Sequence, residues 1–128
     1  MARLIKRGTV QVDTWRLLGK DEPVAEDLQP STPIIVHVAT WLAQAARLAE
    51  RPAQHTGVWL DSDDEPEAIA AYCRHLPLIA VNFPVFTDGR GYSIGRLLRD
   101  RFAFVGELRA IGDVLVDQVF YLKRCGFD

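Results

Sequence analysis

From residue 34 onward, short apolar runs alternate with segments whose apolar residues recur at helical spacing. The apolar runs, each typical of a buried strand, lie near residues 34–38, 57–61, 78–83 and 104–108. Strands that alternate with helices predict βα repeats and a parallel sheet. We therefore expect an α/β fold, a three-layer domain with a parallel sheet of at least four strands. A half-barrel is the alternative, because βα repeats can build either form.

Polar residues mark where the intervening helices are expected to begin and end. Thr40 is placed to cap the helix that follows the first strand, and Ser93 the helix that follows the third. The run from Asp61 to Pro66 is typical of a helix start, since acidic residues favour the positive helix end and proline fits the first turn. The last helix is expected to begin near Asp113 and to end at Gly126.

The N-terminal part has a different pattern. The segment 1–18 is expected to form a β-hairpin, whose strands lie within residues 3–18 and whose turn contains Gly8. Residues 19–33 are expected to form an irregular connection. Together with the βα repeats over 34–128, they give one domain spanning residues 1–128. Residues 126–128 resemble the start of a further strand that the chain does not complete.

Composition narrows the classes of function. The chain is 48% apolar and 25% charged, as in globular domains, and its net charge of −2 argues against general nucleic-acid binding. No apolar run approaches the roughly 18 residues that a membrane span needs. The polar N-terminus is unlike a signal peptide, which predicts a cytoplasmic protein. Cysteine and histidine spacings match no zinc motif, and no P-loop is present, so we expect neither a metal nor a cofactor.

Residues that could bind a ligand or take part in catalysis are expected at one edge of the sheet. In open α/β sheets, ligands bind beyond the carboxyl ends of the strands. The residues expected there are His37, Asp61, Phe83, Phe86, Asp88, Gly89, Arg90, Gly91, Tyr92, Ser93, Glu107, Arg109 and Asp113. They form one candidate site.

The loop at 87–93 is the most informative part of this edge, because it follows a strand and opens a helix. Our anion-binding candidates are Asp88, Gly89, Arg90, Gly91, Tyr92 and Ser93, with Arg109 as a second cation. Glycines allow a close backbone approach, N–H groups at a helix start hold anions, and a guanidinium adds a bidentate contact. The alternative is a tight structural loop. The spacing of Gly89, Gly91 and Gly95 is one residue too long for a dinucleotide fingerprint.

A second cluster supports this site. It consists of Glu107, Arg109, Asp113 and Asp117, of which the two aspartates share one helix face. Paired carboxylates can serve acid–base catalysis or hold a metal. The alternative is a helix cap at Asp113 together with a salt-bridged face.

Several segments of the chain resemble the sequence of a known protein family. They are residues 78–93, 96–99, 106–115, 117–118 and 124–128. The chain resembles a bacterial family catalogued as domain of unknown function nine-three-four. The chain departs from the family at Ile94–Gly95, where a polar residue and alanine are expected. The family also continues past Asp128, which implies either a truncated chain or a naturally short protein.

The resemblance implies a pathway. Members of the family are typically encoded beside assimilatory sulfite reductase and labelled probable oxidoreductases. We therefore expect an accessory protein of sulfite reduction that acts with the reductase or its electron donor. A small oxidoreductase-like enzyme with an oxyanion site at 87–93, and a structural oligomerising domain, are the alternatives. Apart from the resemblance, we expect the chain to self-associate, or to bind a partner, through the surface beside the 104–108 strand and the last helix. The alternative is a monomer in which the N-terminal hairpin covers that edge.

Overall fold

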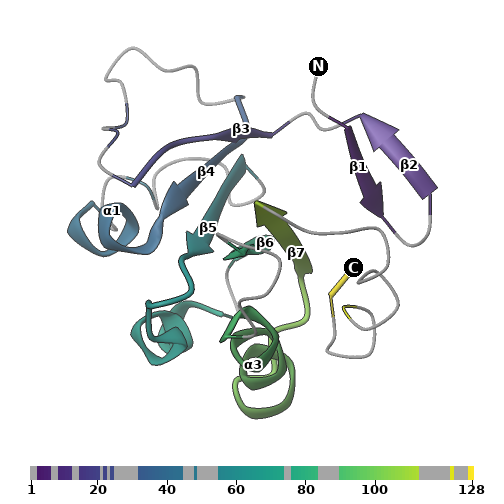
Figure 1. Cartoon of the computed structure of the whole chain (residues 1–128). Helices are drawn as coiled ribbons and strands as arrows, with labels where there is room; N and C mark the ends of the chain where they lie inside the picture. The colour runs from purple at the N-terminus through teal and green to yellow at the C-terminus, as the bar shows by residue number, and fades with distance from the viewer. Residues whose placement is uncertain are drawn as a thin grey trace.

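The computed structural model describes residues 3–6, 9–12, 15–20, 22, 24, 32–44, 48, 55–73, 76–83, 90–112, 122 and 127–128. It confirms the α/β fold: five parallel strands, in the order β3-β4-β5-β6-β7, form a half-barrel (Figure 1). The strands are β3 (Arg16–Leu17), β4 (Ile34–His37), β5 (Thr56–Leu60), β6 (Leu78–Phe83) and β7 (Glu107–Gly112). Of the two expected architectures, the structure therefore has the curved one.

The helices lie along one side of this curved sheet (Figure 1). Those with described bounds are α1 (Val38–Ala43), the 3-10 helix η2 (Pro66–Tyr72), α3 (Arg90–Arg96) and the π-helix η3 (Leu97–Arg101), which continues α3 directly. We call the helix-covered side of the sheet its outer face and the opposite side its inner face. Among the described residues, no helix is both long enough and apolar enough to span a membrane.

Alternation along the strands divides the core between these two faces. The larger cluster includes Val36, Val58, Leu60, Ile79, Val81 and Leu108, which pack with helix residues such as Trp41, Ile69 and Leu98. The smaller cluster on the inner face consists of Ile35, Trp59, Leu78 and Ala80, with Trp15 and Ile111 against it. Buried on both faces, the strands have the near-continuous apolar runs from which they were predicted.

Three of the four predicted strands agree with the structure to within a residue, and the fourth is displaced. The fourth strand exists, but its predicted bounds of 104–108 are wrong, because β7 begins at Glu107, whose N–H donates to the Pro77 carbonyl at 3.0 Å. Phe104 belongs instead to the turn that ends η3, where its N–H bonds to the Leu98 carbonyl at 2.9 Å. Its ring is buried in the core from this turn. An apolar residue in a turn was thus mistaken for part of a strand.

The N-terminal hairpin is confirmed over a shorter range than expected. Strands β1 (Arg3–Lys6) and β2 (Thr9–Val12) pair antiparallel, with Arg3 opposite Val12. The prediction that the hairpin extends to residue 18 is wrong, because β3 pairs parallel with β4. Backbone hydrogen bonds from Arg16 to Pro33 and from Leu18 to Ile35, both 2.9 Å, attach this segment to the main sheet. The strand β3 therefore adds a fifth strand to the sheet.

Two predicted caps are also wrong. The helix α1 begins at Val38 and is capped by His37 rather than Thr40, since His37 ends β4 in an extended conformation. Ser93 lies inside α3, which begins at Arg90. The helix predicted after Asp61 begins at Pro66 as expected, in 3-10 form. The predicted helix start at Asp113 and its end at Gly126 lie outside the described residues.

Candidate functional site

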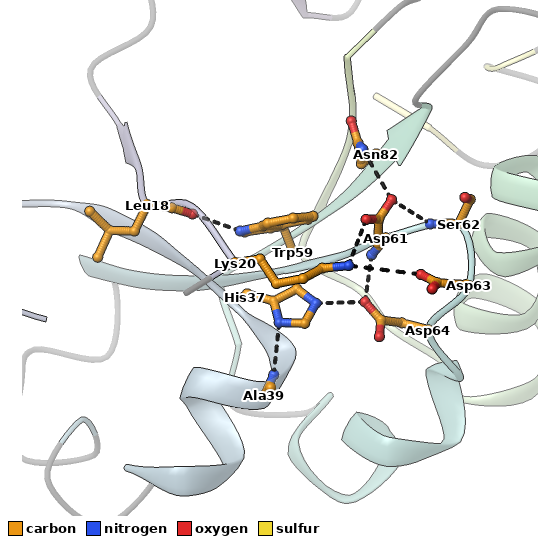
Figure 2. Close-up of polar contacts among 10 residues, drawn as sticks. All are labelled: Leu18, Lys20, His37, Ala39, Trp59, Asp61, Ser62, Asp63, Asp64 and Asn82. Atoms are coloured by element: carbon orange, nitrogen blue, oxygen red, sulfur yellow. Dashed lines mark hydrogen bonds and ion pairs between the residues drawn. The ribbon is translucent and has the colours of Figure 1, made fainter. Parts of the chain in front are cut away.

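Polar side chains gather where β4, β5 and β6 end (Figure 2). His37 is the last residue of β4, Asp61 follows β5, and Asn82 is the penultimate residue of β6. Parallel strands bring their carboxyl ends to the same edge, so these residues become neighbours. We call the following set the carboxyl-edge cluster: Lys20, His37, Asp61, Ser62, Asp63, Asp64 and Asn82.

Asp61 lies at the centre of the cluster. One carboxylate oxygen, Oδ1, accepts hydrogen bonds from the Ser62 N–H at 2.9 Å and from Asn82 Nδ2 at 3.1 Å. The other, Oδ2, accepts from Lys20 Nζ at 2.9 Å. Burial alone raises the pKa of Asp61, but the bonds from Lys20, Asn82 and Ser62 together lower it below the ordinary value. Asp61 is therefore an ionised carboxylate near neutral pH.

Lys20 is the cation that forms an ion pair with Asp61. Its pKa is raised, chiefly by the hydrogen bond to Asp61 and also by the charges of Asp61, Asp63 and Asp64. An amine serves as a nucleophile or Schiff-base former only when its pKa is lowered. Lys20 is therefore an ammonium group with an electrostatic role.

His37 has both ring nitrogens engaged. Its Nδ1 accepts a hydrogen bond from the Ala39 N–H at 3.3 Å, which places the proton on Nε2. Nε2 then donates to Asp64 Oδ2 at 2.7 Å. The side chain is 4% exposed, and its ring packs edge-on against Trp59 with the centroids 4.7 Å apart. His37 therefore joins the start of α1 to the loop after β5.

The loop after β5 is held by its own aspartates. The Asp61 N–H donates to Asp64 Oδ2 at 2.8 Å, and the Asp64 N–H donates to the Asp61 carbonyl at 3.0 Å. Asp64 thus binds His37 and the Asp61 backbone through the same oxygen. This closed loop fixes where both carboxylates lie at the edge of the sheet.

The cluster presents net negative charge to solvent. Its three aspartates face the single ammonium group of Lys20, and the Asp63 side chain is 68% exposed, with one contact to Lys20 Nζ at 4.0 Å. Glu65 and Glu67, which follow in the chain, are exposed as well. Such a surface suits a basic protein patch better than an anion. Within the described ranges, no group of three or more histidine, cysteine or acidic residues could hold a metal ion.

The predicted anion-binding residues lie elsewhere, and two of them, Asp88 and Gly89, fall outside the described residues. Arg90 and Ser93 are exposed in α3. Gly91 packs against Phe83, and a Cβ there would lie 2.6 Å from the ring. The Tyr92 ring meets Phe83 edge-on, with the centroids 5.0 Å apart. Close helix–strand packing accounts for Gly91, while anion binding by the loop remains a prediction that titration calorimetry with sulfite can check.

The supporting cluster is brought together in part. Glu107 and Arg109 form a buried ion pair, with Arg109 Nη2 2.6 Å and Nε 2.8 Å from Glu107 Oε2. Arg109 is paired in register with Ala80 and so faces the inner side of the sheet, whereas α3 packs on Phe83 of the outer face. The sheet therefore separates Arg109 from the α3 residues. Asp113 and Asp117 lie outside the described residues.

Sequence reasoning placed His37 and Asp61 at this edge but missed their partners. The sequence pattern predicts a helix start at Ser62, Asp63 and Asp64 and an irregular connection at Lys20. Asn82 gave a usable signal, because it interrupts an otherwise apolar strand close to its carboxyl end. Lys20 gave none, since it reaches Asp61 across 41 positions of the chain.

Comparison with known proteins gives one family. The model of the family described as "Bacterial protein of unknown function (DUF934)" matches residues 57–128, more than half of the chain. This match includes the loop after β5, the strand β6 that carries Asn82, and the helix α3. No curated protein and no solved structure matches the chain.

Proposed function

Because the chain belongs to the bacterial family of unknown function DUF934, we propose that it is an accessory protein of assimilatory sulfite reduction. It acts by contact with sulfite reductase or its electron donor, and the carboxyl-edge cluster is the contact site. The pathway comes from the resemblance, which implies that members of the family are encoded beside assimilatory sulfite reductase. The site and the mode of action come from the chemistry of the cluster.

One observation carries the choice of a contact role over catalysis at this site. Three groups of the cluster that could transfer protons or attack a substrate have their polar atoms engaged by neighbours. His37 uses both ring nitrogens, Asp61 accepts three hydrogen bonds, and Lys20 is an ammonium group. General acid–base catalysis needs a group that can come within hydrogen-bond reach of the substrate. These residues favour binding through fixed charges.

The charge of the site defines the kind of partner surface. Exposed carboxylates at Asp63, Glu65 and Glu67 accompany the partly exposed Asp61 and Asp64. Complementary charges across an interface speed association and select the correct partner. We therefore expect the partner to contribute lysine and arginine side chains, and the association to weaken as salt is raised.

The test is genetic and biochemical. In the native host, a tagged copy of this protein should co-purify with sulfite reductase or its electron donor at low salt. A deletion strain should grow poorly with sulfate as the sole sulfur source and normally with sulfide. If the deletion strain grows normally on sulfate and nothing of the pathway co-purifies, the proposed function is wrong.

Asp63 offers a specific variant for complementation. Its side chain is largely exposed and makes one long contact, at 4.0 Å, among the described residues, so Asp63→Lys reverses a charge of the site and should leave the fold intact. Asp100→Lys makes the same change at an exposed position on η3 and serves as the matched control. The first variant should complement growth less well than the second.

A further inference from the structure

The helix α1, which starts at the carboxyl-edge cluster, exposes an apolar face. Its residues Ala39, Leu42 and Ala43 are all exposed. Leu42, at 45% exposure, is one of three large apolar residues that are exposed in the described part of the chain. Residues three and four apart lie on the same face of an α-helix. The three side chains therefore form one apolar face, which begins one residue after the cluster ends at β4.

The helix η2 exposes apolar residues as well. In a 3-10 helix, residues three apart lie in line along the helix. Pro66, Ile69 and Tyr72 form the inward line, since Pro66 and Ile69 are buried and Tyr72 packs against the core. Ala68 and Ala71 form an outward line, and both are exposed. The outward side of η2 is therefore lined by small apolar side chains.

Contacts between side chains place the two helices next to each other and next to the cluster. The ring of Trp41 in α1 meets the ring of Tyr72 in η2 edge-on, with the centroids 5.6 Å apart. Figure 2 shows His37 between the start of α1 and the loop before η2, where it bonds to the Ala39 N–H and to Asp64. We call the following set the α1–η2 face: Ala39, Leu42, Ala43, Ala68 and Ala71.

Acidic side chains border this face. Neither α1 nor η2 contains a lysine or an arginine, whereas Glu65 and Glu67 at the start of η2 are exposed carboxylates. Asp63, just before them, is 68% exposed. Protein interfaces combine an apolar centre with a polar rim, and complementary charges select the partner. A partner of this face therefore needs apolar side chains that are accompanied by basic ones.

We propose that the α1–η2 face docks an amphipathic helix of the partner protein. The apolar side of that helix packs on Leu42 and the neighbouring alanines, and its lysine and arginine side chains reach Asp63, Glu65 and Glu67. A helix suits this surface, because rows of side chains three and four apart pack against the rows of two adjacent helices. The identity of the partner rests on the proposed function, whereas the chemistry of the face is a property of this chain alone.

A synthetic peptide tests the docking in the absence of the natural partner. The probe is a helical peptide of about 14 residues, composed of leucine and lysine, with the leucines on one face. NMR spectra of the full chain at low salt should show shifts at Ala39, Leu42 and Ala68 when the peptide is added. Leu42→Gln should weaken its binding roughly five- to twentyfold, since the leucine loses its apolar contact. Val105→Gln, at the 87% exposed valine before β7, is the matched control and should bind like the wild type.

Two further peptides separate docking on an apolar face from simple attraction of charge. A peptide of the same composition, with its leucines spread around the helix, should bind at least about fivefold more weakly. An amphipathic peptide of leucine and glutamate should not bind, because the acidic border repels it.

The inference is overturned if the leucine–lysine peptide does not bind, or if its shifts lie outside α1 and η2. Equal weakening by Leu42→Gln and Val105→Gln, or equal binding of either further peptide, would overturn it too. No sulfite-reducing protein is present in this assay. A negative result therefore leaves the test of the proposed function by the deletion strain unaffected.

Discussion

At the scale of single residues, the lowered pKa of Asp61 makes the stability of the protein depend on pH. Folded Asp61 binds a proton less readily than unfolded Asp61, whose ordinary pKa is 3.8. The unfolded state therefore takes up protons first as the pH falls. The stabilisation is complete above the ordinary pKa and is lost as the pH falls through the lower, folded value.

Urea denaturation at several pH values measures this effect. The unfolding free energy of the wild type should fall as the pH drops below about 4. Asp61→Asn should flatten that part of the profile, whereas Asp63→Asn, at a more exposed carboxylate, should leave it nearly unchanged. A profile for Asp61→Asn that is as steep as that of the wild type would show that the bonds to Asp61 do not stabilise the fold.

A second residue-scale prediction concerns Gly91, where packing explains the glycine. In Gly91→Ala, the new methyl group would overlap the Phe83 ring, which is buried between β6 and α3. Overpacking of this kind destabilises by roughly 1–3 kcal/mol. Gly19→Ala is the control, because its nearest neighbouring atom would lie 3.8 Å away. Calorimetric melting of the two variants should separate them, and equal melting temperatures would refute the packing explanation.

At the scale of elements, Arg99 joins the end of η3 to the start of β7. Its Nη1 donates to the carbonyls of Phe104 and Gly106 at 2.9 and 2.8 Å, and its Nη2 donates to Asp128 Oδ2 at 2.7 Å. Asp128 Oδ2 also accepts from the Leu108 N–H at 2.8 Å. One guanidinium therefore fixes the turn, the strand and the last residue of the sequence.

Substitution of Arg99 should reveal this role. Arg99→Met should lower the unfolding free energy by roughly 2–4 kcal/mol, since it leaves two carbonyls and a carboxylate without their donor. Arg99→Lys should recover only part of the loss, because an ammonium group cannot reproduce the planar fork. Chemical denaturation measures both. Full recovery by lysine would show that charge alone matters at this position.

Some elements can be predicted from the sequence and others cannot, because sequence patterns report local structure and not contacts between distant segments. Strands β4, β5 and β6 could be predicted because each is a short apolar run next to helical spacing. Strand β7 was misplaced because Phe104 is buried from a turn, which single-residue hydrophobicity cannot distinguish from a strand. The cluster was predicted only at His37 and Asp61, since its other contacts depend on how distant loops fold back.

At the scale of the whole molecule, β7 is the last strand in the order of the described sheet. The N–H of Glu107 donates to the carbonyl of Pro77, the residue just before β6. Backbone groups of successive residues in a strand point to opposite sides, so the N–H and C=O of Leu108 and Ala110 point away from β6. At Leu108 both groups are bonded to Asp128. Edge strands with exposed backbone groups invite pairing with another chain. Self-association beside β7 stays a prediction, and Ala110, whose backbone groups point away from β6, is a position at which to test it.

Light scattering at several concentrations measures this association. The mass of the wild type should rise with concentration, and Ala110→Pro should reduce the rise, because proline removes an N–H on the side away from β6. Ile111→Pro, which removes an N–H facing β6, should instead unfold the sheet edge. A constant monomeric mass for the wild type would contradict the prediction.

The proposed contact between the carboxyl-edge cluster and the sulfite-reducing machinery depends on the negative charge of the cluster. The test is a binding measurement. Wild-type protein, Asp63→Lys and Asp100→Lys are each immobilised, and the binding of purified sulfite reductase and of its electron donor to each is measured. We predict salt-sensitive binding of one of the two proteins, weakened roughly three- to tenfold by Asp63→Lys and unchanged by Asp100→Lys. No binding of either protein to the wild type, or equal weakening by the two variants, would contradict the account.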